Sequence, residues 1–281
     1  MNRKLYAAPA AVLLAGLALA GCESAGAGTG EVAEDCTPAA EFATITEGTL
    51  TVAAPEFPPY SSPADGGSGL EFDMISDFAA ANCLTVTIQD VTYANTVPTV
   101  QQGRADIGIG DYYRTEARAA EVELSDPVFL DEMAIISKEG QGTITDIESA
   151  KVGTVDGYLW VPDMQDVMGA DNLQIYPSNV EMKNDLEAGR IDVGLDSFGA
   201  ASQAFEGTDY TVTAVQSDDR VASSVEPAQV GFPMTPDAAD FHEAVNAQIA
   251  TWHEEGYIAE KLEEYGLPAT GAEVGEPRLI A

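Results

Sequence analysis

Short apolar runs alternate with segments of helical periodicity along most of the chain. Residues 70–82 predict a helix, because Phe72, Ile75 and Phe78 recur at helical spacing on one face. Residues 49–54 form an apolar, β-rich run that predicts a strand. Further strands are expected at 84–88, 105–109, 133–137, 152–155, 173–176, 191–195, 210–215 and 229–232, and further helices at 94–102 and 236–255. This alternation predicts an α/β fold with largely parallel sheets.

One short phrase occurs twice in the chain. Residues 102–110 are Gln-Gly-Arg-Ala-Asp-Ile-Gly-Ile-Gly, and residues 188–196 are Ala-Gly-Arg-Ile-Asp-Val-Gly-Leu-Asp. In each copy a glycine, Gly103 or Gly189, is suited to the left-handed position that ends a helix, and an apolar run follows. Because the copies are far apart, they predict two α/β lobes of similar size rather than a solenoid. A cleft between two lobes is the expected place for a binding site.

Capping signals mark where two helices of the second half begin. Thr145 with Glu148, and Ser178 with Glu181, match the capping box that opens a helix. The first pair is expected to start the second lobe, and the strand at 133–137 is expected to lead out of the first.

The N-terminus has the pattern of an export signal. Arg3 and Lys4 precede an apolar run at 11–20, which is shorter than the roughly 20 residues that span a bilayer. Leu19-Ala20-Gly21-Cys22 resembles the bacterial lipobox, so residues 1–21 are expected to be removed and Cys22 to carry the lipid. The alternative is an ordinary signal peptide with a chance cysteine. Residues 22–41, small, polar and acidic in their first part, are expected to form a tether.

The two remaining cysteines, Cys36 and Cys83, are expected to pair, because an exported protein meets an oxidising environment. Two separate buried thiols are the alternative, since sequence does not give their distance.

The chain is strongly acidic, with a formal net charge of −35 over 281 residues. Removing residues 1–21 deletes two bases and no acids, which gives −37. Nucleic acid is excluded as a partner, because it requires a basic face. Two explanations of the negative charge remain open: it attracts cationic solutes, or it forms a solubilising surface.

Taken in order, these segments resemble the family 3 extracellular solute-binding proteins, the amino-acid receptors of ABC importers, over about residues 42–268. The phrases that carry the resemblance are Gly48-Thr49-Leu50-Thr51-Val52, Phe57-Pro58-Pro59-Tyr60, Gln102-Gly103-Arg104-Ala105-Asp106, Thr115-Glu116-Ala117-Arg118, Ser125-Asp126-Pro127, Val152-Gly153-Thr154-Val155 and Ala188-Gly189-Arg190-Ile191-Asp192 through Asp196. The resemblance implies a type II periplasmic binding protein-like fold, in which two crossover strands join two α/β lobes and the ligand lies in the cleft between them. The expected parts are lobe one at 42–135 and 229–268, lobe two at 136–228, and a C-terminal tail at 269–281.

The resemblance also assigns ligand contacts. Arg118 matches the arginine that grips the ligand α-carboxylate, and Asp196 matches the acid that receives the α-ammonium. Phe57 matches an aromatic residue that stacks on the ligand, with Tyr60 and Tyr93 at neighbouring positions. Arg118 could instead be a solvated helix residue, Asp196 a helix N-cap, and the aromatic residues plain core.

The chain departs from the family where small hydroxyl residues are usual. It has Asp111-Tyr112-Tyr113-Arg114 in the first lobe and Gly157-Tyr158-Leu159-Trp160 in the second. Cation–π contact contributes about 0.5 to 2 kcal/mol per ring, so aromatic residues beside acids predict a cationic, amino-acid-like ligand. The residues of this expected box are Phe57, Tyr113, Tyr158, Trp160, Asp111 and Asp196. In the alternative, Asp111 pairs internally with Arg114 or Arg118.

Catalytic signatures are scarce. His242 and His253 lie off the apolar stripe of their helix, and no HExxH, GxSxG or P-loop motif occurs. No catalytic residue, cofactor or metal site is therefore expected. The implied partners are an amino-acid-like ligand and the permease subunits of an importer. The protein is expected to be a monomer. Its lipid is expected to anchor it to the outer face of the bacterial cell membrane. The alternatives are a cyclohexadienyl dehydratase-like enzyme and an extracytoplasmic sensor domain on the same fold.

Overall fold

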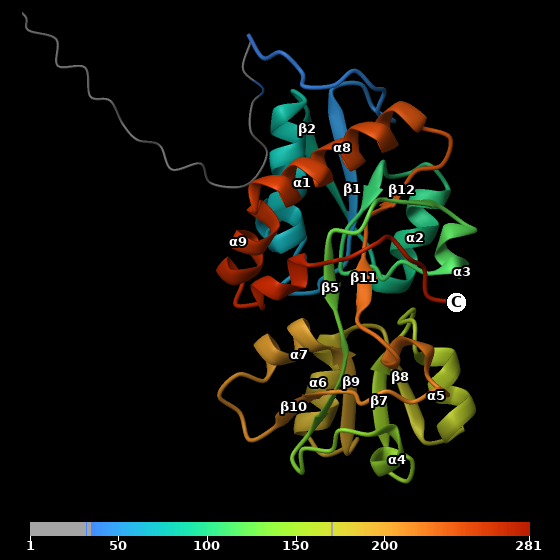
Figure 1. Cartoon of the computed structure of the whole chain (residues 1–281). Coiled ribbons are helices and arrows are strands. Elements are labelled where there is room, and N and C mark those ends of the chain that lie inside the picture. The colour runs from blue at the N-terminus through green and yellow to red at the C-terminus, as the bar shows by residue number, and fades with distance from the viewer. Residues whose placement is uncertain (1–31, 33–34, 170) are drawn as a thin grey trace, which may run out of the picture.

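Figure 1 shows the structure, a computed structural model that describes residues 32, 35–169 and 171–281. Cys22 and the expected signal peptide at 1–21 lie outside the described residues. Among the described residues, no helix is long and apolar enough to cross a membrane.

The first lobe, at the top of Figure 1, is a five-stranded sheet with helices packed on it. Its strands are β2 (Thr85–Asp90), β1 (Thr49–Ala54), β3 (Ile107–Gly108), β12 (Pro233–Met234) and β4 (Glu123–Leu124), in that order. Its helices are α1 (Leu70–Ala81), α2 (Tyr93–Gln101), α3 (Glu116–Ala119), α8 (Ala239–Glu255) and α9 (Tyr257–Glu264), with a short 3-10 turn at Ala64–Gly66. Strand β1 pairs in parallel with both β2 and β3, whereas β12 runs antiparallel to its neighbours.

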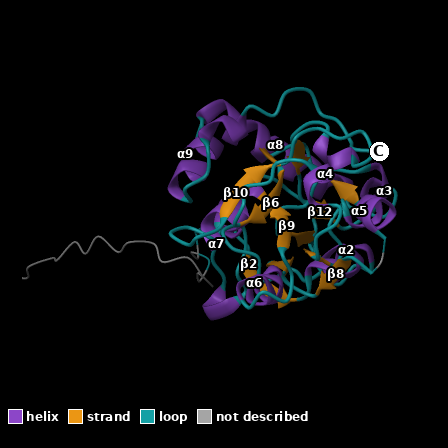
Figure 2. Cartoon of the chain, turned by 90° about the horizontal axis from the view of Figure 1, so that it is seen from below, coloured by secondary structure: helices purple, strands orange, loops and turns teal. Residues whose placement is uncertain are grey.

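The second lobe has a sheet of its own. Its strands are β10 (Thr211–Ala214), β6 (Met133–Ser137), β9 (Val193–Ser197), β7 (Val152–Val155) and β8 (Leu173–Tyr176), in that order. Its helices are α4 (Ile144–Ile147), α5 (Val161–Met168), α6 (Asn179–Glu187) and α7 (Phe198–Ala204), with a 3-10 turn at Ala222–Ser224. Seen from below, helices surround these strands (Figure 2).

Two short strands connect the lobes, as the resemblance implies, but the outgoing strand is not the expected one at 133–137. Strand β5 (Phe129–Asp131) leads down and β11 (Ala228–Val230) leads back, and the two pair antiparallel. The sequence places residues 133–135 in the first lobe, but β6 pairs with β9 in the second sheet. Sheet membership therefore puts the change of lobe next to Glu132, immediately after the crossover strand.

Helix ends follow some of the sequence signals. Gly103 and Gly189 have φ angles of 63° and 69°, as their predicted C′ positions require. The Ser178 side chain accepts a hydrogen bond from the backbone N–H of Glu181, which confirms that cap. The predicted cap at Thr145 is wrong, because Thr143 caps α4 by accepting from Asp146 N at 3.2 Å.

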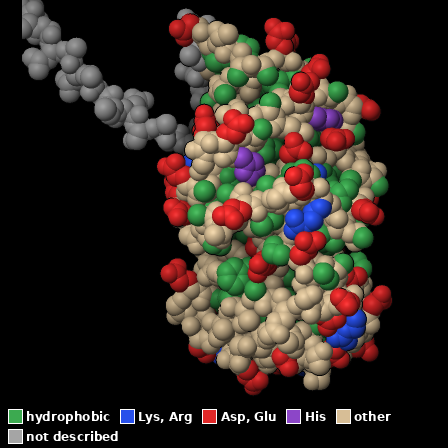
Figure 3. All heavy atoms as spheres, in the orientation of Figure 1, with side chains coloured by type: hydrophobic (Ala, Val, Ile, Leu, Met, Phe, Trp, Pro, Cys, Tyr) green, Lys and Arg blue, Asp and Glu red, His purple; other side chains and the backbone are tan. Residues whose placement is uncertain are grey.

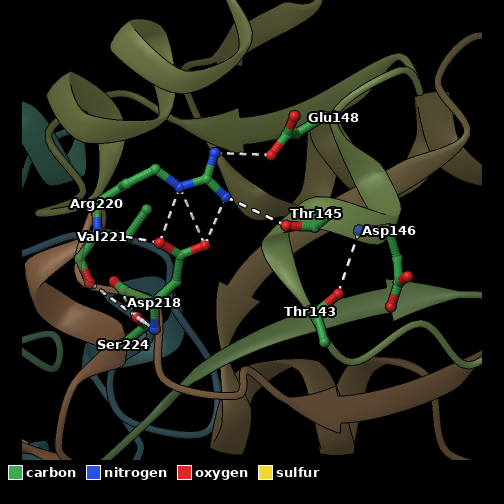
Figure 4. A network of polar contacts seen from close by, with 8 residues as sticks. All are labelled: Thr143, Thr145, Asp146, Glu148, Asp218, Arg220, Val221 and Ser224. Carbon is green, nitrogen blue, oxygen red and sulfur yellow. Dashed lines mark hydrogen bonds and ion pairs between the residues drawn. The ribbon is translucent and has the colours of Figure 1, made fainter.

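The residues of the expected Thr145 cap serve another contact, shown in Figure 4. Thr145 Oγ1 and Glu148 Oε1 both accept hydrogen bonds from the guanidinium of Arg220, at 3.3 and 2.8 Å. Arg220 also pairs with Asp218 and holds the pKa of that carboxyl down at about 2. The network thus fixes the segment before β11 against α4.

A disulfide joins Cys36 to Cys83, with Cα atoms 5.8 Å apart. It links the start of the folded body to the end of α1. The predicted pairing is confirmed, and the alternative of two separate thiols is wrong.

The C-terminal tail contacts a crossover strand and helix α3. The buried Gln229 side chain of β11 donates to the carbonyls of Val274 and Glu276, each at 2.8 Å. Farther along, the carbonyl of Ile280 accepts from the N–H of Glu116 in the first turn of α3. The tail therefore holds both a crossover strand and the helix that carries Arg118.

Acidic side chains are spread over both lobes of the face in Figure 3 rather than gathered in one patch. This distribution favours the solubilising explanation of the negative charge.

Close contact between the lobes predicts the effect of one substitution. A Cβ on Gly199, in α7, would lie 2.1 Å from Tyr60 Oη and 2.9 Å from Leu267 Cδ2, both in the first lobe. Gly199→Ala should leave the second lobe folded, since alanine suits a helix, but hold the lobes apart. Small-angle scattering should show a larger radius of gyration than for Ser202→Ala on the same helix. Equal radii would refute the close approach.

Candidate functional site

Side chains from both lobes meet beside the crossover strands and enclose a cavity of about 10 Å³. This volume is close to the smallest space that holds a single water. The lobes are therefore closed on each other, and side chains occupy the cleft. The lining residues are Phe57, Tyr93, Asp111, Tyr113 and Arg118 from the first lobe, and Tyr158, Leu159, Trp160 and Ser197 from the second.

Aromatic rings from the two lobes interlock in this cleft. The ring of Tyr158 lies 4.9 Å from Tyr93, 5.9 Å from Phe57 and 4.9 Å from Trp160, measured between centroids. Trp160 in turn lies 6.2 Å from Tyr113. These tilted and edge-on geometries are the favourable ones for aromatic pairs. The structure thus gathers the expected aromatic residues, with one exception.

Tyr60 is the exception, because it does not line this cavity. Its ring stacks on Phe129 at 5.7 Å, and its hydroxyl donates to Asp131. It faces a separate cavity of about 170 Å³ behind the crossover strands.

Arg118 projects from α3, where Thr115 accepts a hydrogen bond from its backbone N–H. The guanidinium donates to Tyr113 O at 2.7 Å and to Gly157 O of the other lobe at 3.2 Å. It also lies over the Tyr112 ring at 5.1 Å. Arg118 is therefore a contact between the lobes rather than a solvated helix residue. Within the described part of the chain, no carboxylate pairs with it.

Asp196 lies in strand β9, beside the cavity but not on its wall. Its Oδ1 accepts from the Tyr158 hydroxyl at 2.7 Å and from Ser197 N at 2.9 Å. The N-cap alternative for Asp196 is wrong, because the Ser197 side chain caps α7. Tyr158 separates Asp196 from the cavity.

Asp111 has no arginine partner in the described residues, which contradicts the internal-pair alternative. The guanidinium of Arg114 is used by Ser125 O, Gln229 Oε1 and Arg278 O. Asp111 Oδ1 is buried without any hydrogen-bond partner there, and the same holds for the Tyr113 hydroxyl.

Two buried acids escaped the sequence reasoning. Glu71, in the first turn of α1, accepts from the backbone N–H of Gly110 at 2.6 Å and of Asp111 at 2.9 Å. Asp131 ends β5 and accepts from the Tyr60 hydroxyl and from Glu132 N. In the sequence, Glu71 looks like an ordinary acid at the start of a helix, so nothing marks it as buried. Asp131 directly follows the apolar run 128–130, and that position could have indicated a buried acid.

Burial governs the ionisation of these acids. It raises the pKa of Glu71 and of Asp196 to about 7. Burial, and then the charges of Asp131 and Glu71, hold the pKa of Asp111 well above its usual range, and burial also raises the pKa of Asp131. The cleft therefore holds carboxyl groups that keep protons toward neutral pH.

Comparison with known proteins is consistent with this geometry. Residues 50–268 match the model of the bacterial extracellular solute-binding proteins, family 3. The glutamate-binding protein GluB of Corynebacterium efficiens is 24% identical, over 94% of this chain and 91% of its own. The histidine-binding periplasmic protein of Escherichia coli is 23% identical, over 80% and 90%.

Solved structures show the same fold. An amino acid ABC transporter substrate-binding protein of Streptococcus pneumoniae, bound to L-arginine, superposes with a TM-score of 0.68 at 20% identity, over 82% of this chain and 98% of its own. The two lobes with paired crossover strands are thus a type II periplasmic binding protein fold.

The raised pKa of Asp196 predicts how stability depends on pH. Between about pH 4 and 7 the folded state binds more protons at this group than the unfolded state, so its contribution to stability falls as pH rises. Asp196→Asn removes this titration, and Tyr158 can still donate to the amide oxygen. Urea unfolding should show a shallower loss of stability between about pH 4 and 7 than the wild type or the surface variant Asp209→Asn shows. Identical slopes would contradict a raised pKa.

Proposed function

The chain belongs to the bacterial extracellular solute-binding proteins of family 3, and on that premise we propose that it is the substrate-binding protein of an ABC importer. It captures an amino acid or a related small, cationic zwitterion by closing its lobes. Its partners are that ligand and the permease subunits in the membrane, to which it delivers the ligand as a monomer.

The observation that carries this proposal is that Arg118 of the first lobe lines the closed cleft, while Asp196 of the second lobe lies behind Tyr158, which lines it too. A guanidinium makes two parallel charge-assisted bonds to a carboxylate, and a carboxylate suits an ammonium group. In this structure backbone carbonyls accept from Arg118, and the Tyr158 hydroxyl donates to Asp196. A zwitterion replaces these contacts with charged ones at both ends. Because it binds both lobes, it favours the closed form.

The walls of the cleft support a cationic ligand. Rings of Phe57, Tyr113, Tyr158 and Trp160 lie around Asp111, which no arginine neutralises in the described residues. A cation there gains both ring and carboxylate contacts. The names of the relatives give different ligands, so the proposal of a cationic ligand rests on these side chains and not on the relatives.

The same cleft meets one requirement of the dehydratase alternative, since carboxyl groups that keep a proton near neutral pH lie beside an arginine. A general acid of that kind serves an elimination on a cyclic carboxylate. The named relatives are binding proteins, so the receptor is the function proposed.

Substitution of Arg118 tests the binding function. The body from residue 36 onward is screened by thermal unfolding against amino acids, polyamines, betaines and prephenate-like acids. A ligand at about 100 times its dissociation constant adds about 2.7 kcal/mol of stability. Arg118→Ala should weaken binding of a zwitterionic hit by roughly tenfold to a hundredfold, because charge-assisted hydrogen bonds are lost. Calorimetric titration measures the change.

Arg104→Ala is the matched control, because Arg104 lies at the surface outside the cleft, and it should bind like the wild type. Unchanged affinity in Arg118→Ala would refute the carboxylate contact. A cyclic acid that is converted rather than bound would favour the dehydratase.

We propose further that residues 1–21 are a signal peptide and that lipid on Cys22 anchors the protein. Cys22→Ser should move the protein from the membrane pellet to the soluble fraction, as immunoblots of fractionated cells would show. The double variant Cys36→Ser/Cys83→Ser keeps Cys22 and should stay in the pellet. A Cys22→Ser protein that remains membrane-bound would exclude the anchor.

A further inference from the structure

We propose that Tyr158 is a gate that competes with the ligand for Asp196. Its hydroxyl bonds Asp196 until the α-ammonium of an amino-acid ligand displaces it, and the side chain then turns into a neighbouring cavity, where Asn179 accepts the hydroxyl. This inference rests on the proposed function, in which Asp196 receives the α-ammonium. It makes Tyr158 a residue that sets the affinity for the ligand, rather than only a wall of the cleft.

Tyr158 fills the place that the ligand needs. The central cavity measures about 10 Å³, close to the space of one water, so an amino acid does not fit beside the Tyr158 ring. Tyr158 is only 5% exposed, and its hydroxyl donates to Asp196 Oδ1 at 2.7 Å. An α-ammonium on Asp196 must therefore take the place of the tyrosine hydroxyl.

The second lobe contributes two aromatic side chains to the cleft, and Tyr158 is the one that is free to turn. Trp160 is fixed from behind, because its indole N–H donates to the buried Thr154 hydroxyl at 2.8 Å. The Tyr158 hydroxyl is held instead by the acceptor that the ligand takes. The backbone beside it is fixed, since Arg118 donates to Gly157 O across the cleft. The motion is therefore a rotation of the Tyr158 side chain.

A second cavity lies on the other side of the ring. It measures about 290 Å³ and shares three lining residues, Phe57, Tyr93 and Tyr158, with the central cavity. These rings form the wall between the two spaces. The Tyr158 ring lies 5.9 Å from Phe57 and 4.9 Å from Tyr93, between centroids. It can therefore turn into the larger cavity and keep contact with both.

The larger cavity also holds an acceptor for the displaced hydroxyl. Asn179 lines it and is 8% exposed. Asn179 Oδ1 is buried and has no hydrogen-bond partner among the described residues. Buried polar atoms are rarely left without partners in native proteins. The hydroxyl of Tyr158, once turned, would satisfy this atom.

The order of the strands places Tyr158 between its two acceptors. Strands β9, β7 and β8 are adjacent in that order and run parallel. Tyr158 follows β7, the middle strand, whereas Asp196 lies near the end of β9 and Asn179 starts α6, after β8. Burial raises the pKa of Asp196, and the Asn179 side chain is among the groups that lower it, so the two acceptors are close together. A short rotation therefore exchanges one acceptor for the other.

Isothermal titration calorimetry with L-lysine tests the gate. Tyr158→Phe keeps the ring but cannot bond Asp196, so it should bind lysine roughly threefold to tenfold more tightly than the wild type. Asn179→Ala removes the acceptor for the displaced hydroxyl and should weaken lysine binding by about the same factor. Asn184→Ala, at an exposed position of the same helix, is the matched control and should bind like the wild type.

The double variant Tyr158→Phe/Asn179→Ala distinguishes a gate from two separate effects. Without the hydroxyl, Asn179 has nothing to accept, so the double variant should bind lysine as tightly as Tyr158→Phe does. Three results would overturn the gate: weaker binding in Tyr158→Phe than in the wild type, wild-type affinity in Asn179→Ala, or an equal loss from Asn179→Ala with and without the hydroxyl. The last result would assign Asn179 to ligand contact or to the fold.

The outcomes also separate this inference from the proposed function. Equal lysine affinity in the wild type and all of these variants, abolished by Arg118→Ala, would keep the amino-acid receptor and remove the gate. No lysine binding to any of the proteins would overturn both.

Discussion

Four carboxyl groups buried where the two lobes meet are the constraint on which the rest of this structure depends. Glu71, Asp111, Asp131 and Asp196 are all buried there, and no lysine or arginine pairs with them within residues 35–169 and 171–281. Taking an ion out of water costs several kcal/mol in a real protein. These groups therefore keep their protons or need a cation from outside. In the function we propose, these buried carboxyl groups favour both a cationic ligand and the closed form that holds it.

The architecture holds these acids at a point where they act on both lobes. Asp131 ends the strand that leaves the first lobe, and Asp196 is the next-to-last residue of a strand in the second. Arg118 reaches across to Gly157, while the C-terminal tail bonds both β11 and the start of α3. The acids, the arginine and the tail therefore connect the two lobes at the crossover.

Much of the fold could be predicted from local patterns. The repeated glycine positions at Gly103 and Gly189 gave the two-lobe organisation, because a left-handed helix end is a local requirement. The Thr145 cap could not be rejected locally, since the Thr145 side chain instead accepts from Arg220, a residue far away in the sequence. The change of lobe was placed three residues too late, within β6, for a similar reason, because the partner strand β9 comes some 60 residues later.

The candidate site was predictable where the family resemblance supplied residues and less so elsewhere. Aromatic residues from both halves do converge, but Tyr60 packs behind the crossover instead. Asp131 and Glu71 differ from ordinary surface acids only because folding buries them, and the sequence alone does not show which acids are buried. The isolation of Asp111 from both arginines likewise depends on carbonyl groups that attract those side chains.

A crystal structure of the protein with L-lysine tests the central claim most directly. The account predicts one ligand between the closed lobes, with its carboxylate on Arg118, its α-ammonium on Asp196 in place of the Tyr158 hydroxyl, and its side-chain ammonium among the aromatic rings beside Asp111. A ligand seated in the cavity behind the crossover strands, or bound to one lobe alone, would contradict it.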